Sequence, residues 1–174
     1  MKKLLFVILL SIFTIGISQA QNYKYIGAAK CKMCHNKPEK GQQYTTWLEN
    51  KHSHAMEMLK TDRAKEVGAK MNIHDPVTSP TCISCHSTFG HVDGKLISGL
   101  NITEGVSCES CHGPGSMYKG ASVMKNRDLA LDKGMILPTE EVCKQCHNSK
   151  SPTFKGFNYE EAIKQIDHSN PLLK

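Results

Sequence analysis

The stretch that decides the fold reads Gly105-Val106-Ser107-Cys108-Glu109-Ser110-Cys111-His112-Gly113-Pro114-Gly115. At its centre is a Cys-x-x-Cys-His motif, the pattern that attaches a c-type haem. The two thiols form thioethers with the haem vinyl groups, and His112 supplies the proximal imidazole to the iron. Two residues between the cysteines let both sulfurs reach one edge of the porphyrin from a short helical turn.

The same motif occurs four times and uses all eight cysteines of the chain. Paired cysteines also occur in zinc sites and dithiol redox centres, and residues 82–111 hold two pairs near zinc-ribbon spacing. Neither chemistry needs a histidine directly after every second cysteine, so the motifs predict four c-type haems, each with one iron. The predicted attachment residues are Cys31, Cys34, His35, Cys82, Cys85, His86, Cys108, Cys111, His112, Cys143, Cys146 and His147.

The first 20 residues have the features of a secretory signal peptide. Two lysines form a basic start, residues 4–15 are apolar, and Ser18-Gln19-Ala20 presents small residues to a signal peptidase. An uncleaved anchor is the alternative, but the apolar run is shorter than the roughly 20 residues of a spanning helix. We therefore expect cleavage after Ala20, no membrane span in the mature chain, and a single periplasmic domain over residues 21–174.

The charge of the chain is moderately basic, with 22 Lys and Arg against 16 Asp and Glu. Two of the lysines leave with the signal peptide, and four haems bring about eight propionates. The basic balance therefore does not predict nucleic-acid binding. Because only 39% of the residues are hydrophobic, we expect haem faces to supply much of the buried apolar surface.

The hydrophobic pattern predicts a mainly α fold with long loops, wrapped around the haems. The clearest helix covers residues 42–60, with His52 inside its apolar stripe, and Thr61 can cap the next helix. Two further helices are expected over residues 122–133 and 159–167. Little β structure is expected, limited to one small hairpin around Asp93-Gly94.

Five histidines lie outside the motifs: His52, His54, His74, His91 and His168. A second imidazole gives low-spin iron suited to electron transfer, whereas an open sixth position can bind a small molecule. His52 is the best candidate for a distal ligand, with a hydrogen-bonded core histidine as the alternative. His168 follows a helix end, and from the residues alone its ligation stays open. Solvated side chains are expected for the remaining three.

These stretches resemble the tetrahaem cytochrome c-554 family, multihaem carriers that accept electrons from hydroxylamine oxidoreductase in ammonia oxidisers. The resemblance covers most of the mature chain. It includes the flanking Gly-Val and Gly-Pro-Gly of the third motif, residues 47–57 around His52, and residues 157–168. It implies that His52 is the distal ligand opposite His147, and that His168 is the distal ligand opposite His112. It also implies a five-coordinate haem on His86, unless His91 or another side chain closes it.

One position departs from the family pattern. The distal histidine of the first haem is expected ten residues beyond the third motif, where this chain has Ser122. A serine hydroxyl is a poor iron ligand. Met124 could supply a thioether and raise the reduction potential of the haem on His35, and His74 is the other candidate. Core packing is the alternative role for Met124.

The sequence thus predicts a periplasmic multihaem c-type cytochrome that carries electrons between periplasmic or membrane-bound redox proteins. An enzyme is the alternative, one that reduces or oxidises nitric oxide, hydroxylamine, nitrite or peroxide at a five-coordinate haem. His74 and His91 would be its only candidates for proton delivery. A small-gas sensor is a third possibility, ranked last. Because the chain is shorter than the family prototype, an identical partner is not assumed.

Overall fold

The computed structural model describes residues 22–171, so the predicted signal peptide of residues 1–20 lies outside the described range. Within that range the chain is helical with long loops and forms no strand, which confirms the predicted class. The helices are α1 (Ala29–His35), α2 (Gln43–Leu48), α3 (Ala55–Met58), α4 (Asp62–Lys70), α5 (Pro80–His86), α6 (Thr88–His91), α7 (Cys108–His112), α8 (Ala121–Met124), α9 (Arg127–Asp132), α10 (Glu140–Lys144) and α11 (Tyr159–Ile166).

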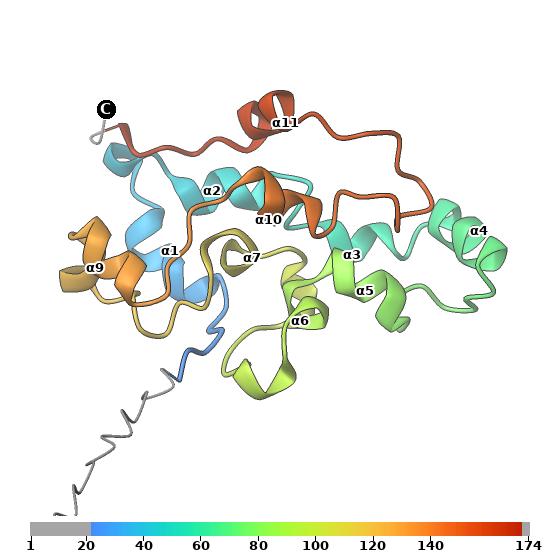
Figure 1. The fold of residues 1–174 in the computed structure, drawn as a ribbon, viewed down its shortest axis with the longest axis horizontal. Helices are drawn as coiled ribbons and strands as arrows, with labels where there is room; N and C mark the ends of the chain where they lie inside the picture. Colours follow the sequence, from blue (N-terminus) through green and yellow to red (C-terminus); the bar gives the residue numbers. More distant parts are fainter. Residues whose placement is uncertain (1–21, 172–174) are drawn as a thin grey trace, which may run out of the picture.

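The short helices are arranged around α7, which lies near the centre of the molecule (Figure 1). Helices α1 and α9 lie toward one end of the long axis, and α4 lies at the other end. After α11 the chain returns along α2. There Asn50 donates a hydrogen bond to the carbonyl of Gln165, and Gly41 lies against the carbonyl of Ser169.

The helix expected over residues 42–60 is broken, and this prediction was wrong in its continuity. Helix α2 ends at Leu48 and α3 begins at Ala55, so His52 lies in the turn between them. The hydroxyl of Ser53 donates to the carbonyls of Leu48 and Asn50. Such local side-chain hydrogen bonds compete with the helical backbone pattern. The turn is also held from outside, since the amide of Val106 donates to the carbonyl of His52.

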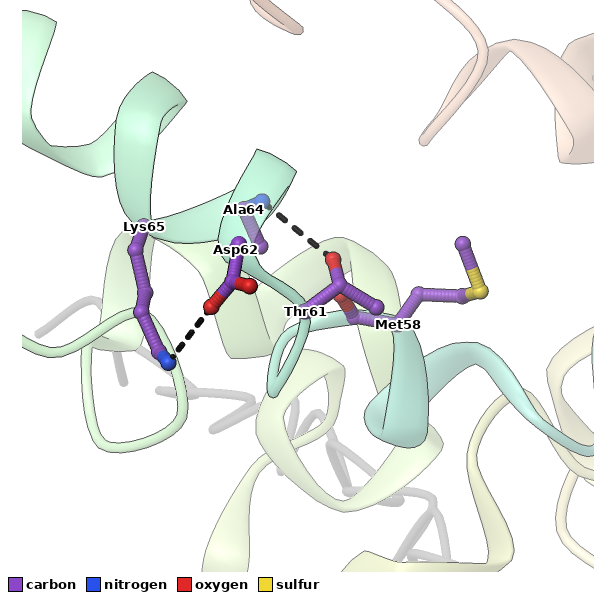
Figure 2. A network of polar contacts seen from close by, with 5 residues as sticks. All are labelled: Met58, Thr61, Asp62, Ala64 and Lys65. Atoms are coloured by element: carbon purple, nitrogen blue, oxygen red, sulfur yellow. Dashed lines mark hydrogen bonds and ion pairs between the residues drawn. The ribbon is translucent and has the colours of Figure 1, made fainter.

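The predicted cap at Thr61 is confirmed. Its hydroxyl oxygen accepts a hydrogen bond from the amide of Ala64 at 3.3 Å, and α4 begins at the next residue (Figure 2). The same hydroxyl donates to the carbonyl of Met58 at 2.8 Å. One side chain therefore satisfies groups at the end of α3 and at the start of α4. Beside it, Lys65 pairs with Asp62 at 2.9 Å, and this pair lowers the pKa of Asp62.

Replacing the cap gives a direct test of its contribution. The Thr61→Ala variant should lose about 1 kcal/mol of unfolding free energy, the typical cost of removing a threonine cap. Lys65→Ala is the matched control, because an exposed ion pair contributes little and both side chains of this pair are exposed. Denaturant unfolding of the two holoproteins measures the difference. Equal stabilities for the two variants would contradict the role of the cap.

The hairpin expected around Asp93-Gly94 is absent from the structure. Residues 88–91 form α6, and Gly94–Leu96 form a short 3-10 helix. The carboxylate of Asp93 accepts a hydrogen bond from the amide of Lys95, which gives an Asx-type turn in place of a hairpin turn. The segment pairs instead with the N-terminal region. The amide of Tyr25 donates to the carbonyl of Leu96, and Tyr25 forms an isolated parallel bridge with Ile97.

The two C-terminal helix predictions have different outcomes. The helix expected over residues 122–133 is split into α8 and α9, because Asn126 caps the second piece by accepting from the amide of Leu129. The chain then turns at Gly134, whose φ of 92° favours glycine. Helix α11 forms as predicted, and Asn158 caps it through the amide of Glu161.

The apolar core of the described chain is small. Met56, Leu59 and Ile83 form its main cluster, with Val77 and Ile102 packed against it. Such a core agrees with the expectation that haem faces supply much of the buried apolar surface. Among the described residues, no helix has the length and apolar character needed to cross a bilayer.

Candidate haem sites

Each Cys-x-x-Cys-His motif lies on a short helical turn. The first three motifs close α1, α5 and α7, which end at His35, His86 and His112. In the fourth motif Cys143 lies in α10, and His147 follows in the turn after it. Residues i, i+3 and i+4 of a helix share one face, so each turn presents two thiols and an imidazole together. This donor set fits a c-type haem.

The motifs are packed against one another in space. The side chains of Cys31 and Cys108 lie close enough to shift each other's pKa, so the first motif packs against the third. The side chain of Cys85 likewise lies close enough to raise the pKa of Cys146, so the second motif packs against the fourth. None of the eight cysteines forms a disulfide. Residues 22–171 hold no group of three or more His, Cys, Asp or Glu side chains arranged to bind a metal ion.

His52 lies beside His147, the proximal histidine of the fourth motif. Their ring centroids are 6.0 Å apart and the ring planes cross at 74°. The ring of Phe157 stacks on His147 at 4.9 Å with an interplanar angle of 21°. The fourth-motif imidazole is therefore flanked by an aromatic ring that fixes its plane and by a second imidazole.

His168 lies beside His112 in the same way. The ring centroids are 5.9 Å apart, and the planes cross at 80°. Nδ1 of His168 lies 2.7 Å from the carbonyl of Ile166. A carbonyl can only accept, so Nδ1 carries the proton and Nε2 is left as the free ligand atom.

Both separations suit a shared iron. A metal–imidazole bond of about 2 Å on each side, with about 1 Å from each nitrogen to its ring centre, gives about 6 Å between centroids. Burial, followed by the charge of the facing histidine, lowers the pKa of His52 and of His112. Burial also lowers the pKa of His147. The unprotonated imidazole that a metal requires is therefore favoured at these positions.

The second motif has an oriented proximal histidine and no second imidazole ready to bind. Nδ1 of His86 donates to the carbonyl of Ala55 at 2.7 Å, which leaves its Nε2 for iron. Both nitrogens of His91 are engaged, one 3.1 Å from the carbonyl of Ser84 and the other 2.9 Å from Oε1 of Gln145. His91 therefore links the second and fourth motifs as the chain is folded here.

The remaining candidates lie farther from the predicted sites. His54 is exposed and pairs with Glu57 at 3.6 Å, in agreement with the expected solvated side chain. His74 is exposed in the connector that follows α4, and α4 lies at the end of the molecule away from α1 (Figure 1). The structure thus does not bring it to the first motif. Met124 is half-buried at the end of α8, and α8 packs on α9 at the same end as α1.

Two residues of the candidate haem sites were not predicted from the sequence. Phe157 was expected only as the start of the C-terminal segment, although it stacks on a motif histidine. No role was predicted for Glu109, which lies between the two cysteines of the third motif, yet it is 2% exposed. The sequence offers one sign of the importance of Glu109, because its carboxylate lies inside a motif that must face a buried cofactor.

Comparison with known proteins identifies the family of the chain. The family model described as "Cytochrome c554 and c-prime" matches residues 30–113. Cytochrome c-554 of Nitrosomonas europaea is 33% identical over 189 aligned residues, which cover 88% of this chain and 77% of that protein. The chain belongs to the cytochrome c-554 family. No solved structure matches it.

Membership of the cytochrome c-554 family fixes the broad chemistry. The chain is a multihaem c-type cytochrome that acts in electron transfer, it binds c-type haem with its iron, and it exchanges electrons with redox partners. The donor sets described above are the places in this family member where such haems fit.

Proposed function

We propose that this cytochrome carries four haems in the periplasm and passes electrons between a periplasmic or membrane-bound donor and an acceptor. The signal-like residues 1–20 support export. Bound haem supplies one-electron chemistry at its iron, and the protein sets spacing, axial ligands and local polarity.

The observation that carries the proposal is the pairing of histidines. His147 and His112 would be the proximal ligands of the fourth and third haems. Their facing partners, His52 and His168, would be the distal ligands, and each pair has the spacing of two imidazoles on one metal. Two imidazoles keep an iron in one geometry in both oxidation states, which suits electron transfer.

Contacts between the motifs support an internal relay. The thiol contacts join the first motif to the third and the second to the fourth. Cys111 of the third motif also lies near Cys143 of the fourth, because burial, and then the charge of Cys143, raise the pKa of the Cys111 thiol to about 11. Haems attached at these thiols would therefore form one connected chain of neighbours.

A second candidate function is chemistry on a small nitrogen species or peroxide at the second haem. One observation favours it, because both nitrogens of His91 are engaged elsewhere. His86 would then hold an iron with an open sixth position, where a small molecule can bind.

One set of measurements tests the proposal. Purified holoprotein should contain one covalent haem per motif, and a content of two or fewer would reject the tetrahaem assignment. EPR of the oxidised protein should show low-spin signals from haems with two imidazoles. Addition of nitric oxide then separates the two candidates. Low-spin signals from every haem, unchanged by the gas, would reject the enzyme, and a shifted high-spin signal would support an open haem.

A further inference from the structure

Glu109 is a buried carboxylate in the middle of the third motif. It is only 2% exposed. Its two oxygens accept hydrogen bonds from the amide of Ile26, each at 3.0 Å, and from the amide of Gly27 at 2.8 Å. A further amide, that of Gly115, donates to it at 2.6 Å. Three backbone amides from two separate segments therefore converge on this one side chain.

Burying a carboxylate is unfavourable unless hydrogen bonds replace its water. None of the ion pairs among the described residues includes Glu109, so backbone amides are its partners. The approach is close, because a Cβ at Gly115 would lie 3.1 Å from Oε1 of Glu109. The Gly-Pro-Gly turn after the motif thus has a local reason for its last glycine.

A second carboxylate extends the same arrangement. Oε2 of Glu104 accepts from the amide of Ala28 at 2.8 Å. The amides of residues 26–28 are therefore all bound by carboxylates that flank or belong to the third motif. Ala28 directly precedes α1, the helix of the first motif. The contact between Cys31 and Cys108 lies at the same junction, so the start of α1 is fixed to α7.

The charge of Glu109 acts on its surroundings. Burial, followed by this charge, raises the pKa of Tyr25 and of Tyr118. Tyr118 lies on the third motif itself, because its hydroxyl donates to the carbonyls of His112 and Gly113. A negative charge in such a poorly solvated place acts more strongly than at the surface.

We propose that Glu109 is a positioning residue for electron transfer between the first and third haems. It holds the start of α1 against α7, and it places a fixed negative charge near both attachment sites. This inference rests on the proposed tetrahaem function. A nearby negative charge favours the ferric state, so Glu109 should keep the reduction potentials of these two haems low.

The variant Glu109→Gln tests both parts of the role. Glutamine lacks the charge, and its amide nitrogen donates, so it cannot accept all three amide hydrogen bonds. Glu66→Gln is the matched control, because Glu66 is exposed on α4 and its loss changes the net charge equally. Spectroscopic redox titration should show higher potentials for two haems in Glu109→Gln alone. Amide exchange at Ile26 and Gly27 should rise about tenfold or more. Potentials and exchange equal to those of the control would overturn the inference.

A measurement on the unmodified holoprotein covers the case in which Glu109→Gln does not assemble. The amides of Ile26, Gly27 and Gly115 should exchange far more slowly than that of exposed Gly156. Exchange as fast as at Gly156 would overturn the inference even with a full haem content. A deficit of haem in the unmodified protein would instead reject the proposed function, so the two failures are distinguishable.

Discussion

Replacing both thiols of the third motif, in the variant Cys108→Ala with Cys111→Ala, should yield a protein with one covalent haem fewer. Helix α7 lies near the centre of the fold (Figure 1), and its motif contacts both the first and the fourth. Loss of this haem should empty a large buried volume. We expect the unfolding free energy to fall by about 3–5 kcal/mol, the range for emptying a large core site.

The measurements are haem content per chain and denaturant unfolding of the purified proteins. Met33→Ala is the control, because Met33 lies between the two cysteines of the first motif, attaches no haem and is 81% exposed. It should keep the full haem content and the stability of the parent. A double variant that still carries as many covalent haems as the parent protein would contradict attachment at these cysteines.

Local chemistry explains what the sequence predicted well. A Cys-x-x-Cys-His motif fits a single helical turn, so the positions of its three side chains depend on neighbours only. The same holds for the cap at Thr61 and for helix α11, whose start at Asn158 uses a side chain three residues from the amide it caps. Such short-range patterns can be recognised from the sequence without knowledge of the fold.

Contacts between distant segments explain the failures. The periodicity of residues 42–60 is real, yet the chain breaks at residues 49–54 because the amide of Val106 and the side chain of Ser53 bind backbone carbonyls there. The indole of Trp47 donates to the carbonyl of Val106 at 2.9 Å, which adds to the same long-range contact. Tertiary hydrogen bonds thus override a local preference.

The candidate haem sites also divide into features set by neighbouring residues and features set by distant segments. The four proximal histidines follow from the motif, because each directly adjoins its cysteine. The distal partners do not follow from the motif, because His52 lies far before the motif of His147 and His168 lies far after the motif of His112. Only the family resemblance implied those pairings before the structure placed each pair about 6 Å apart. Neither the motif nor the family resemblance indicated the role of Glu109, because its partners are backbone amides, which leave no pattern in the sequence.

His52→Ala should convert the fourth haem from low-spin to high-spin while leaving its thioethers intact. The variant removes the imidazole that faces His147 at 6.0 Å and leaves Phe157 stacked on the proximal ring. About one quarter of the haem iron should change, because the proposed tetrahaem assignment gives one iron to each motif. EPR and the visible spectrum of the oxidised protein measure the change.

His54→Ala is the matched control for this variant. His54 lies two residues away, is exposed, and pairs with Glu57 on the surface. Its loss should leave the spin state of every haem iron unchanged. Added imidazole should enter the space left in His52→Ala and restore the low-spin signal there, with no effect on His54→Ala. If the two variants gave the same spectrum, His52 would be a core histidine, and the pairing with His147 would be packing without a shared iron.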